Sequence, residues 1–196
     1  MWTVESLAAS PRWSHAQTLA VPGTCRGDLL GAWGDNVRAR FGAAGLARVR
    51  DRVPDVAPAL TRRDWVPVHA QLRVTEVIVD ELLGGDGVAL LPLLVEDTRK
   101  GLGRVTTALV RTLGPERSLR GAAKQFREVH DRGSVGFESA DRTARMRFVA
   151  HPVFAHPTWR LLQLHATAVV LALAGADGAV TAEEDGEAFV VRATWR

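Results

Sequence analysis

The spacing of hydrophobic residues changes about two thirds of the way along the chain. Between residues 28 and 130, apolar residues recur mostly three or four positions apart, which is typical of amphipathic helices. From Gly133 onward, apolar and polar residues alternate over two stretches, which predicts antiparallel strands with one buried face. An apolar helix from about Pro157 to Leu173 is expected between these stretches. The pattern therefore predicts helices first, and then a hairpin, a helix and a second hairpin.

Glycine and proline residues divide the helical part into short segments. Asp28 has the side chain of a good N-cap, so we expect the first helix to begin there and to break or kink near Gly42. Pro67 suits the first turn of a later helix. The remaining helical segments are expected over residues 88–101, with a kink or the true start at Pro92, and over residues 104–113 and 115–130.

Two β-hairpins are predicted in the C-terminal third. The first has alternating residues at 135–138 and 143–148 around a turn near Asp141. The second has a strand around residues 179–182 and a final strand over residues 189–195. The predicted fold class is α+β, in which an N-terminal helical layer packs on a four-stranded antiparallel sheet of two hairpins joined by the apolar helix.

The 196 residues are enough for one domain with a sizeable core. We interpret residues 1–24 as an N-terminal extension that packs on the domain, and residues 25–196 as a single α+β domain. Within the extension, Trp2, Val4 and Leu7 carry a short alternation that predicts an edge strand.

Composition narrows the function classes. Apolar residues make up 46% and charged residues 24%, as in ordinary globular proteins. With no secretory signal and no apolar run long enough to span a bilayer, we expect a cytoplasmic protein without a membrane span. The single cysteine, Cys25, allows no intramolecular disulfide and is interpreted as a packing residue. Tyrosine is absent, which excludes any mechanism that needs a phenol.

The sequence lacks the motifs of several kinds of functional site. No phosphate loop, nucleophile elbow or isolated acid–base pair is present, so we do not expect an enzyme. Nucleic acid is not an expected partner either, because no nucleic-acid-binding motif is present and the formal charge is only +3. One predicted helix carries a basic stripe, which we interpret as a solvated face rather than a surface for phosphates, a membrane or an acidic partner: Arg117, Arg120, Lys124 and Arg127.

His165 is the most informative single residue. Placed at 100° per residue on the apolar helix, it falls among apolar side chains, where an imidazole must find a partner. Either it lines a pocket and orients a ligand, or it is a core histidine bonded to a backbone carbonyl, which we favour. His151 and His156 lie nearby in sequence, but their spacing matches no standard metal motif, so no metal site is expected.

A set of short features resembles a family of uncharacterised paralogous proteins from myxobacteria. The matching features are Trp65, Gly101-Leu102-Gly103, Leu113-Gly114-Pro115, Phe126-Arg127, Pro152-Val153-Phe154 and the final stretch from Val190 to Trp195. That family is distantly similar to the haem-nitric-oxide-binding, 4-vinyl-reductase and Bet3-like proteins. The resemblance implies a helical layer and an antiparallel sheet around an apolar pocket. The haem-nitric-oxide branch holds haem propionates with a Tyr-x-Ser-x-Arg motif, which a chain without tyrosine lacks, so the cofactor stays unassigned.

Two functions follow as hypotheses. The first is a small-molecule sensor or carrier with an apolar pocket between the 157–173 helix, the sheet and the 115–130 helix. Its predicted ligand-binding residues are His165, Trp159, Phe126, Phe148 and Val169. The second is a protein-interaction adaptor or homodimerising module without a ligand, in which exposed tryptophans, with Trp2, Trp13 and Trp195 as the first candidates, would contact a signalling partner or a second copy.

Overall fold

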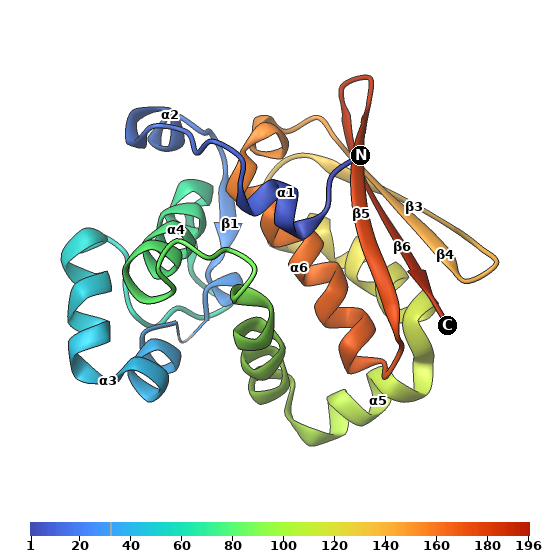
Figure 1. Ribbon diagram of the computed structural model, residues 1–196, viewed down its shortest axis with the longest axis horizontal. Helices are drawn as coiled ribbons and strands as arrows, with labels where there is room; N and C mark the ends of the chain where they lie inside the picture. The colour runs from blue at the N-terminus through green and yellow to red at the C-terminus, as the bar shows by residue number, and fades with distance from the viewer. Residues whose placement is uncertain (32) are drawn as a thin grey trace.

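The computed structural model describes residues 1–31 and 33–196 and has the predicted α+β architecture (Figure 1). One antiparallel sheet holds four strands in the order β3-β4-β6-β5. Its two hairpins are β3 (Ser134–Ala140) with β4 (Thr143–Val149), and β5 (Gly178–Asp185) with β6 (Ala188–Trp195). Pairing of β4 with β6 joins the two predicted hairpins in the centre of the sheet.

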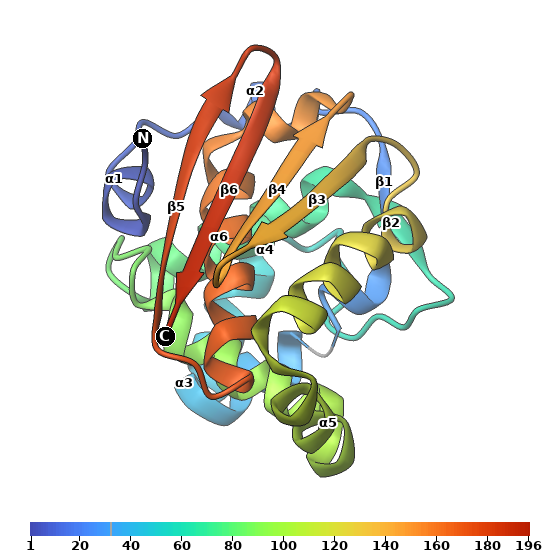
Figure 2. The same ribbon diagram turned by 90° about the vertical axis from the view of Figure 1, so that its right-hand side faces the viewer.

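Helix α6 (Pro157–Leu173) links the hairpins and covers the inner face of the sheet (Figure 2). The alternation explains this contact, because Ala144, Met146 and Phe148 of β4 all point inward and are buried. The opposite face carries charges. Glu183 of β5 pairs there with Arg192 of the neighbouring β6 and with Arg145 of β4, which lies one strand further away. One face of the sheet therefore packs on helices and the other is solvated.

The segment α5 (Leu90–Val129) is divided by two glycines into successive helical parts. Gly103 and Gly114 have φ of 71° and 74°, which interrupt the helical backbone at both places where the sequence predicted a break. Pro92 lies in the first turn and therefore marks the start of the helix rather than a kink within it. The last part of α5 packs beside α6 against the sheet (Figure 2).

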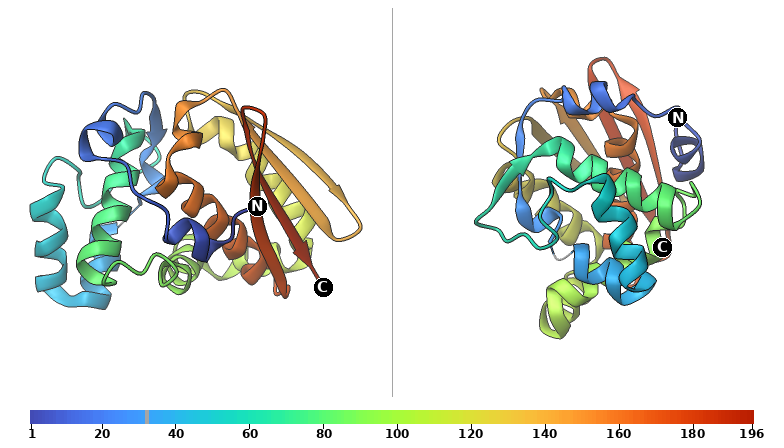
Figure 3. Two further views of the ribbon diagram at one scale, coloured as in Figure 1. Left: turned by 45° about the horizontal axis from the view of Figure 1, so that its top comes forward. Right: turned by 90° about the vertical axis from the view of Figure 1, so that its left-hand side faces the viewer.

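The N-terminal helical layer consists of α3 (Trp33–Arg52) and α4 (Val68–Leu82), on the far side of α6 from the sheet (Figure 3). A short ribbon of β1 (Thr24–Arg26) and β2 (Trp65–Pro67) fixes the beginning of both helices. This layer has its own core, which is made by the following buried residues: Trp33, Val37, Val49, Val53, Val56, Ala70 and Val74.

Two local predictions in this region differ from the structure. Asp28 does not cap a helix of its own; it lies in the 3-10 turn η1 (Gly27–Leu29), and its carboxylate pairs with the Arg26 guanidinium at 2.6 Å. The long helix starts later, at Trp33. The predicted break is present, because Gly42 has φ of 72° inside α3.

Residues 1–24 pack on both layers. The predicted edge strand is limited to Trp2, which exchanges two backbone hydrogen bonds with Ala182 of β5. A capping box at Thr3 and Ser6 then starts the short helix α1 (Val4–Ala8) in place of further strand. Helix α2 (His15–Leu19) follows. Leu7 is buried in the same core as the sheet residues, and the boundary at residue 24 stays a prediction. Within the described residues, no helix is long and apolar enough to cross a bilayer.

Candidate functional site

Three of the predicted ligand-binding residues lie in an aromatic cluster between α6, the sheet and the end of α5. Phe148 is central, with its ring centroid 5.1 Å from that of Trp159 and 5.9 Å from that of Phe126. Phe154 and Phe189 complete the cluster at 5.7 and 6.1 Å from Phe148. Tilted and edge-to-face pairs at these distances are the favoured geometry of aromatic cores. The rings pack against one another in the region where the sequence predicted a pocket.

Val169 is buried on α6. Trp159 is fully buried, and its indole Nε1 has no hydrogen-bond partner within the described residues. These positions make α6 part of the main core. Their role in ligand binding stays a prediction.

His165 is fully buried on α6, and its Nε2 lies 2.9 Å from the carbonyl oxygen of Gly87. A carbonyl can only accept, so Nε2 carries the hydrogen. Burial lowers the pKa of His165, which keeps the ring neutral. This bond is the arrangement expected of a core histidine, and it holds the loop between α4 and α5 against α6.

A cavity of about 740 Å³ lies instead between α3, α4 and the first part of α5. Apolar side chains from all three helices make most of its wall, with additions from the η1 loop and α6. They are Leu30, Trp33, Val37, Phe41, Val74, Ile78, Leu90, Leu94 and Leu162. The cavity is therefore largely apolar and lies where the N-terminal helical layer meets α5.

Charged groups on the cavity wall neutralise one another. The Arg40 guanidinium lies 2.9 Å from carboxylate oxygens of both Asp97 and Glu96, and it also donates to the carbonyl of Leu93 at 3.2 Å. Lys100 pairs with Glu96 at 2.8 Å. Burial raises the pKa of Asp97. This ionic cluster joins α3 to α5, and it leaves the polar part of the wall close to neutral.

No pattern in the sequence marks this cavity. Val37 and Phe41 have the spacing of ordinary core residues, and the stretch containing Leu90 and Leu94 is apolar throughout. Arg40 falls on the polar side of its helix, where charged residues are usually solvated. Core and cavity walls have the same composition, so only the packing of the helices separates them.

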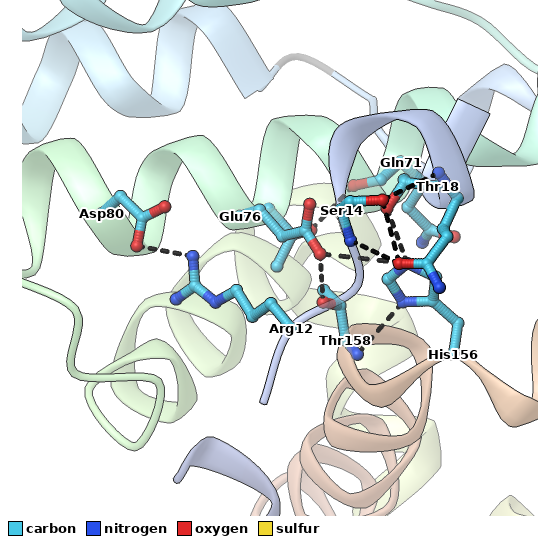
Figure 4. A network of polar contacts seen from close by, with 10 residues as sticks. Arg12, Ser14, Thr18, Gln71, Glu76, Asp80, His156 and Thr158 are labelled. Atoms are coloured by element: carbon cyan, nitrogen blue, oxygen red, sulfur yellow. Dashed lines mark hydrogen bonds and ion pairs between the residues drawn. The ribbon is translucent and has the colours of Figure 1, made fainter. Parts of the chain in front are cut away.

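A buried polar network joins α2, α4 and the start of α6 (Figure 4). Thr158 donates a hydrogen bond of 2.5 Å to Glu76 Oε1. His156 Nε2 lies 3.0 Å from Thr18 Oγ1 and 3.9 Å from the same Glu76 oxygen. Burial raises the pKa of Glu76 and lowers that of His156 to about 4. Threonine, histidine and glutamate are the residue types of a nucleophile, a base and an orienting acid.

The tautomer of His156 argues against such chemistry. Its Nδ1 accepts a hydrogen bond from the backbone N–H of Thr158 at 3.2 Å and therefore carries no hydrogen. The neutral ring must then hold its hydrogen on Nε2, which can only donate to Thr18 or Glu76. An imidazole in this state cannot take a proton from the threonine hydroxyl. The network instead attaches the N-terminal segment to α4 and α6.

Other reactive groups are also engaged in structure. In the described part of the chain, no group of three or more His, Cys, Asp or Glu residues could hold a metal ion. His151 and His156 each use Nδ1 to cap a helical turn, which differs from a shared site with His165. Cys25 is fully buried, and burial raises the pKa of its thiol to about 12, so it is unreactive near neutral pH.

Comparisons with known proteins identify the fold. No protein-family model and no curated protein matches the chain, so the resemblance to the myxobacterial family has no support. Solved structures of H-NOX proteins do match. The Fe(II) unliganded H-NOX protein from K. algicida has a TM-score of 0.55 and 13% identity, covering 87% of this chain and 96% of its own.

A variant of the T. tengcongensis H-NOX protein matches with a TM-score of 0.53 and 12% identity, covering 87% of this chain and 97% of its own. A structure from work on haem redox potential and porphyrin distortion matches with a TM-score of 0.53 and 13% identity. The match covers 86% of this chain and 99% of that structure's chain. Identities this low establish the fold alone. The chain is an α+β protein with the H-NOX fold.

Because that fold implies haem, we tested the cavity for a haem ligand. Haem iron in proteins is held by an axial donor such as His, Cys, Met or Tyr. None of these residue types is among the residues that line the described cavity. Among the buried histidines, His130 stacks on Phe126 and His165 bonds to Gly87, both outside this wall. The residues present do not fit an iron-ligated haem.

Proposed function

We propose that this chain is a non-enzymatic small-molecule-binding domain of the sensor or carrier type, with its ligand in the cavity between α3, α4 and α5. The cavity itself carries the proposal, because about 740 Å³ is within the range of small-molecule sites and its wall is mostly apolar. The space is a cleft open to solvent, because its lining includes the exposed residues Leu29, Lys100 and Leu102. A largely apolar cleft of this size at a junction of three helices is the kind of concave surface that binds small molecules.

The wall also defines the chemistry of the ligand. Its body is apolar, because leucine, valine, isoleucine and aromatic side chains surround it. It carries no net charge, because Arg40 and Lys100 are already paired with Asp97 and Glu96. It binds without a bond from the protein to iron, because no axial donor lines the wall. The proposal thus keeps the sensor or carrier function and places the ligand away from the aromatic cluster around Phe148.

A neutral apolar dye, Nile red, tests the site on the full chain. We expect its fluorescence to rise on binding, and Leu94→Trp, which fills the cavity, to weaken the apparent affinity by at least about tenfold. The matched control Leu109→Trp places the same residue on an exposed part of α5 and should bind the dye as the parent protein does. Equal binding by both variants would remove the cavity as the site.

Ligand recovery provides the second test. Native mass spectrometry of protein purified from its own host should show a bound mass that is absent from Leu94→Trp. If the parent protein carries no added mass and does not bind Nile red, the sensor proposal fails.

The adaptor function is kept as a second candidate on one observation. Trp65 in β2 is 49% exposed, whereas Trp2, Trp13 and Trp195 are half-buried. Exposed tryptophan is enriched at protein interfaces. Light scattering of the parent protein and of Trp65→Ser tests self-association. A parent dimer that the substitution dissociates favours self-association through Trp65. A monomer in both cases excludes self-association.

A further inference from the structure

The middle part of α5, residues 104–113, presents an apolar face to solvent. Gly103 and Gly114 bend the backbone at its two ends, and the segment extends below the sheet and α6 (Figure 2). Exposure reaches 85% for Val105 and 53% for Leu109, and Leu113 is also exposed. These three residues are four apart and therefore share one face of the helix. Leu102, just before the first bend, adds a further exposed apolar side chain.

The direction of this face follows from the contact on its other side. Arg111 lies against the turn at Gly175 that follows α6, so its side of the helix faces the body of the protein. Leu109 is two residues away and points about 200° around the axis from Arg111. The apolar face is thus convex and turned outward, which is the reverse of a core-facing helix.

Basic side chains outnumber acidic ones beside this face. Residues 98–115 contain four exposed basic side chains and no acidic one: Arg99, Lys100, Arg104 and Arg111. Lys100 already pairs with Glu96, and Arg111 faces the body of the protein, so Arg99 and Arg104 are the two that remain for a partner. A second copy of the chain would bring like charges together, which disfavours self-association through this face. A complementary occupant must be both apolar and anionic.

We propose that residues 99–113 form a membrane-docking element, in which Val105, Leu109 and Leu113 enter the interface of an anionic lipid bilayer while Arg99 and Arg104 contact lipid phosphates. Basic amphipathic segments bind anionic bilayers in this way. A lipid surface fits better than a protein partner, because the face consists of Leu and Val, which are under-represented among binding hot spots. A fluid surface also accepts a convex segment without a matching groove. Lys100 and Leu102 also line the cavity, whereas Val105, Leu109 and Leu113, which carry this inference, do not.

Vesicle co-sedimentation of the full chain tests the proposal. We expect at least about tenfold more protein on vesicles of phosphatidylcholine mixed with phosphatidylglycerol than on phosphatidylcholine alone. Val105→Ser/Leu109→Ser should abolish this binding without changing the charge. The control Val88→Ser/Leu19→Ser alters two exposed apolar residues elsewhere, which are 39% and 40% exposed, and should bind as the parent does. Circular dichroism confirms that each variant is folded.

Each result decides the proposal. The proposal is supported if Val105→Ser/Leu109→Ser loses vesicle binding while Val88→Ser/Leu19→Ser keeps it, and if Arg99→Gln/Arg104→Gln weakens the binding. The absence of binding to either vesicle, equal binding to both, or binding that persists in Val105→Ser/Leu109→Ser overturns it. A dimer in light scattering that Val105→Ser/Leu109→Ser dissociates would assign the face to a second copy of the chain instead.

Discussion

His165 and Gly87 are 78 residues apart in sequence and are joined by a hydrogen bond of 2.9 Å between the imidazole Nε2 and the carbonyl oxygen. The bond attaches the loop between α4 and α5 to the middle of α6. Because α5 begins at Leu90, three residues after Gly87, it also positions the part of α5 that lines the cavity. The histidine that stands out in the sequence thus supports the cavity without lining it.

Replacing His165 by Leu should lower the free energy of unfolding by about 0.5–1.5 kcal/mol, because the buried carbonyl of Gly87 then loses its 2.9 Å bond and keeps only the 3.4 Å bond from the Leu90 N–H. His165→Gln should cost less, since its amide can still donate. Urea denaturation measures both variants. A His165→Leu protein as stable as the parent would show that the bond contributes nothing.

Acid should destabilise the protein through its buried histidines. Burial lowers the pKa of His130 and of His156 from the ordinary 6.5 to about 4 in each case. Between these values the unfolded chain binds protons that the folded protein does not, so the free energy of unfolding falls as the pH drops from about 6.5 to about 4. Glu76 opposes this trend, because burial raises its pKa and the folded state takes up its proton first.

Urea denaturation at several pH values from about 7.5 to about 4.5 measures how the free energy of unfolding changes with pH. This interval of ~3 pH units includes the ordinary pKa of histidine. His156→Asn keeps a side chain that can cap α6 and removes one titrating group, so its stability should fall less steeply with acid. The control Leu19→Ser removes no titrating group and should leave the slope unchanged. Stability that stays flat down to pH 4.5 would contradict the prediction.

The stability of the protein should fall when a side chain is added at Gly114 but not when one is added at Gly121. Gly114 has φ of 74° and ψ of 175°, a conformation that only glycine adopts readily, so Gly114→Ala should cost about 1–3 kcal/mol. Gly121 lies in regular helix with open space where the methyl group of an alanine would lie, and Gly121→Ala should stabilise by about 0.5–1 kcal/mol. Thermal denaturation compares the two variants, and equal melting temperatures would contradict the assigned backbone.

The ion pair between Arg40 and Asp97 should contribute more than a surface pair. The Arg40 side chain is only 14% exposed, so a double-mutant cycle of Arg40→Met and Asp97→Asn should give a coupling energy of about 1–3 kcal/mol. The control cycle uses Arg52 and Glu81, a more exposed pair at 3.2 Å, where about 1 kcal/mol or less is expected. Equal coupling in both cycles would mean that Arg40 does not hold α3 to α5.

The C-terminal third could be predicted closely from the sequence. The apolar helix has the expected bounds, Pro157–Leu173, because a proline at its first position and a clear apolar composition mark it on their own. Strand β4 alternates closely between buried and more exposed residues, so its burial follows from the pattern, whereas β6 begins with four successive buried residues. The start of α3 was predicted less well, since the local ion pair between Arg26 and Asp28 competes with capping.

The cavity could not be predicted, for a physical reason. Whether Phe41 or Leu94 contacts another side chain or an empty space depends on how far apart two helices lie, and that distance is set by tertiary packing. The helix break at Gly114 could be predicted from the sequence, but the orientation of the helix that precedes it could not. The sequence predicts a helical segment over residues 104–113, but not that its apolar side chains are exposed, as Val105 and Leu109 are in the structure.

The two backbone hydrogen bonds between Trp2 and Ala182 have a consequence for the behaviour of the chain at high concentration. Strand β5 lies at the margin of the sheet, where unpaired amide and carbonyl groups invite strands from other molecules. The first residues occupy part of this margin, and α1 follows them directly. The N-terminus therefore protects the sheet from intermolecular strand pairing, so that removing a few residues would endanger solubility before it endangered the fold.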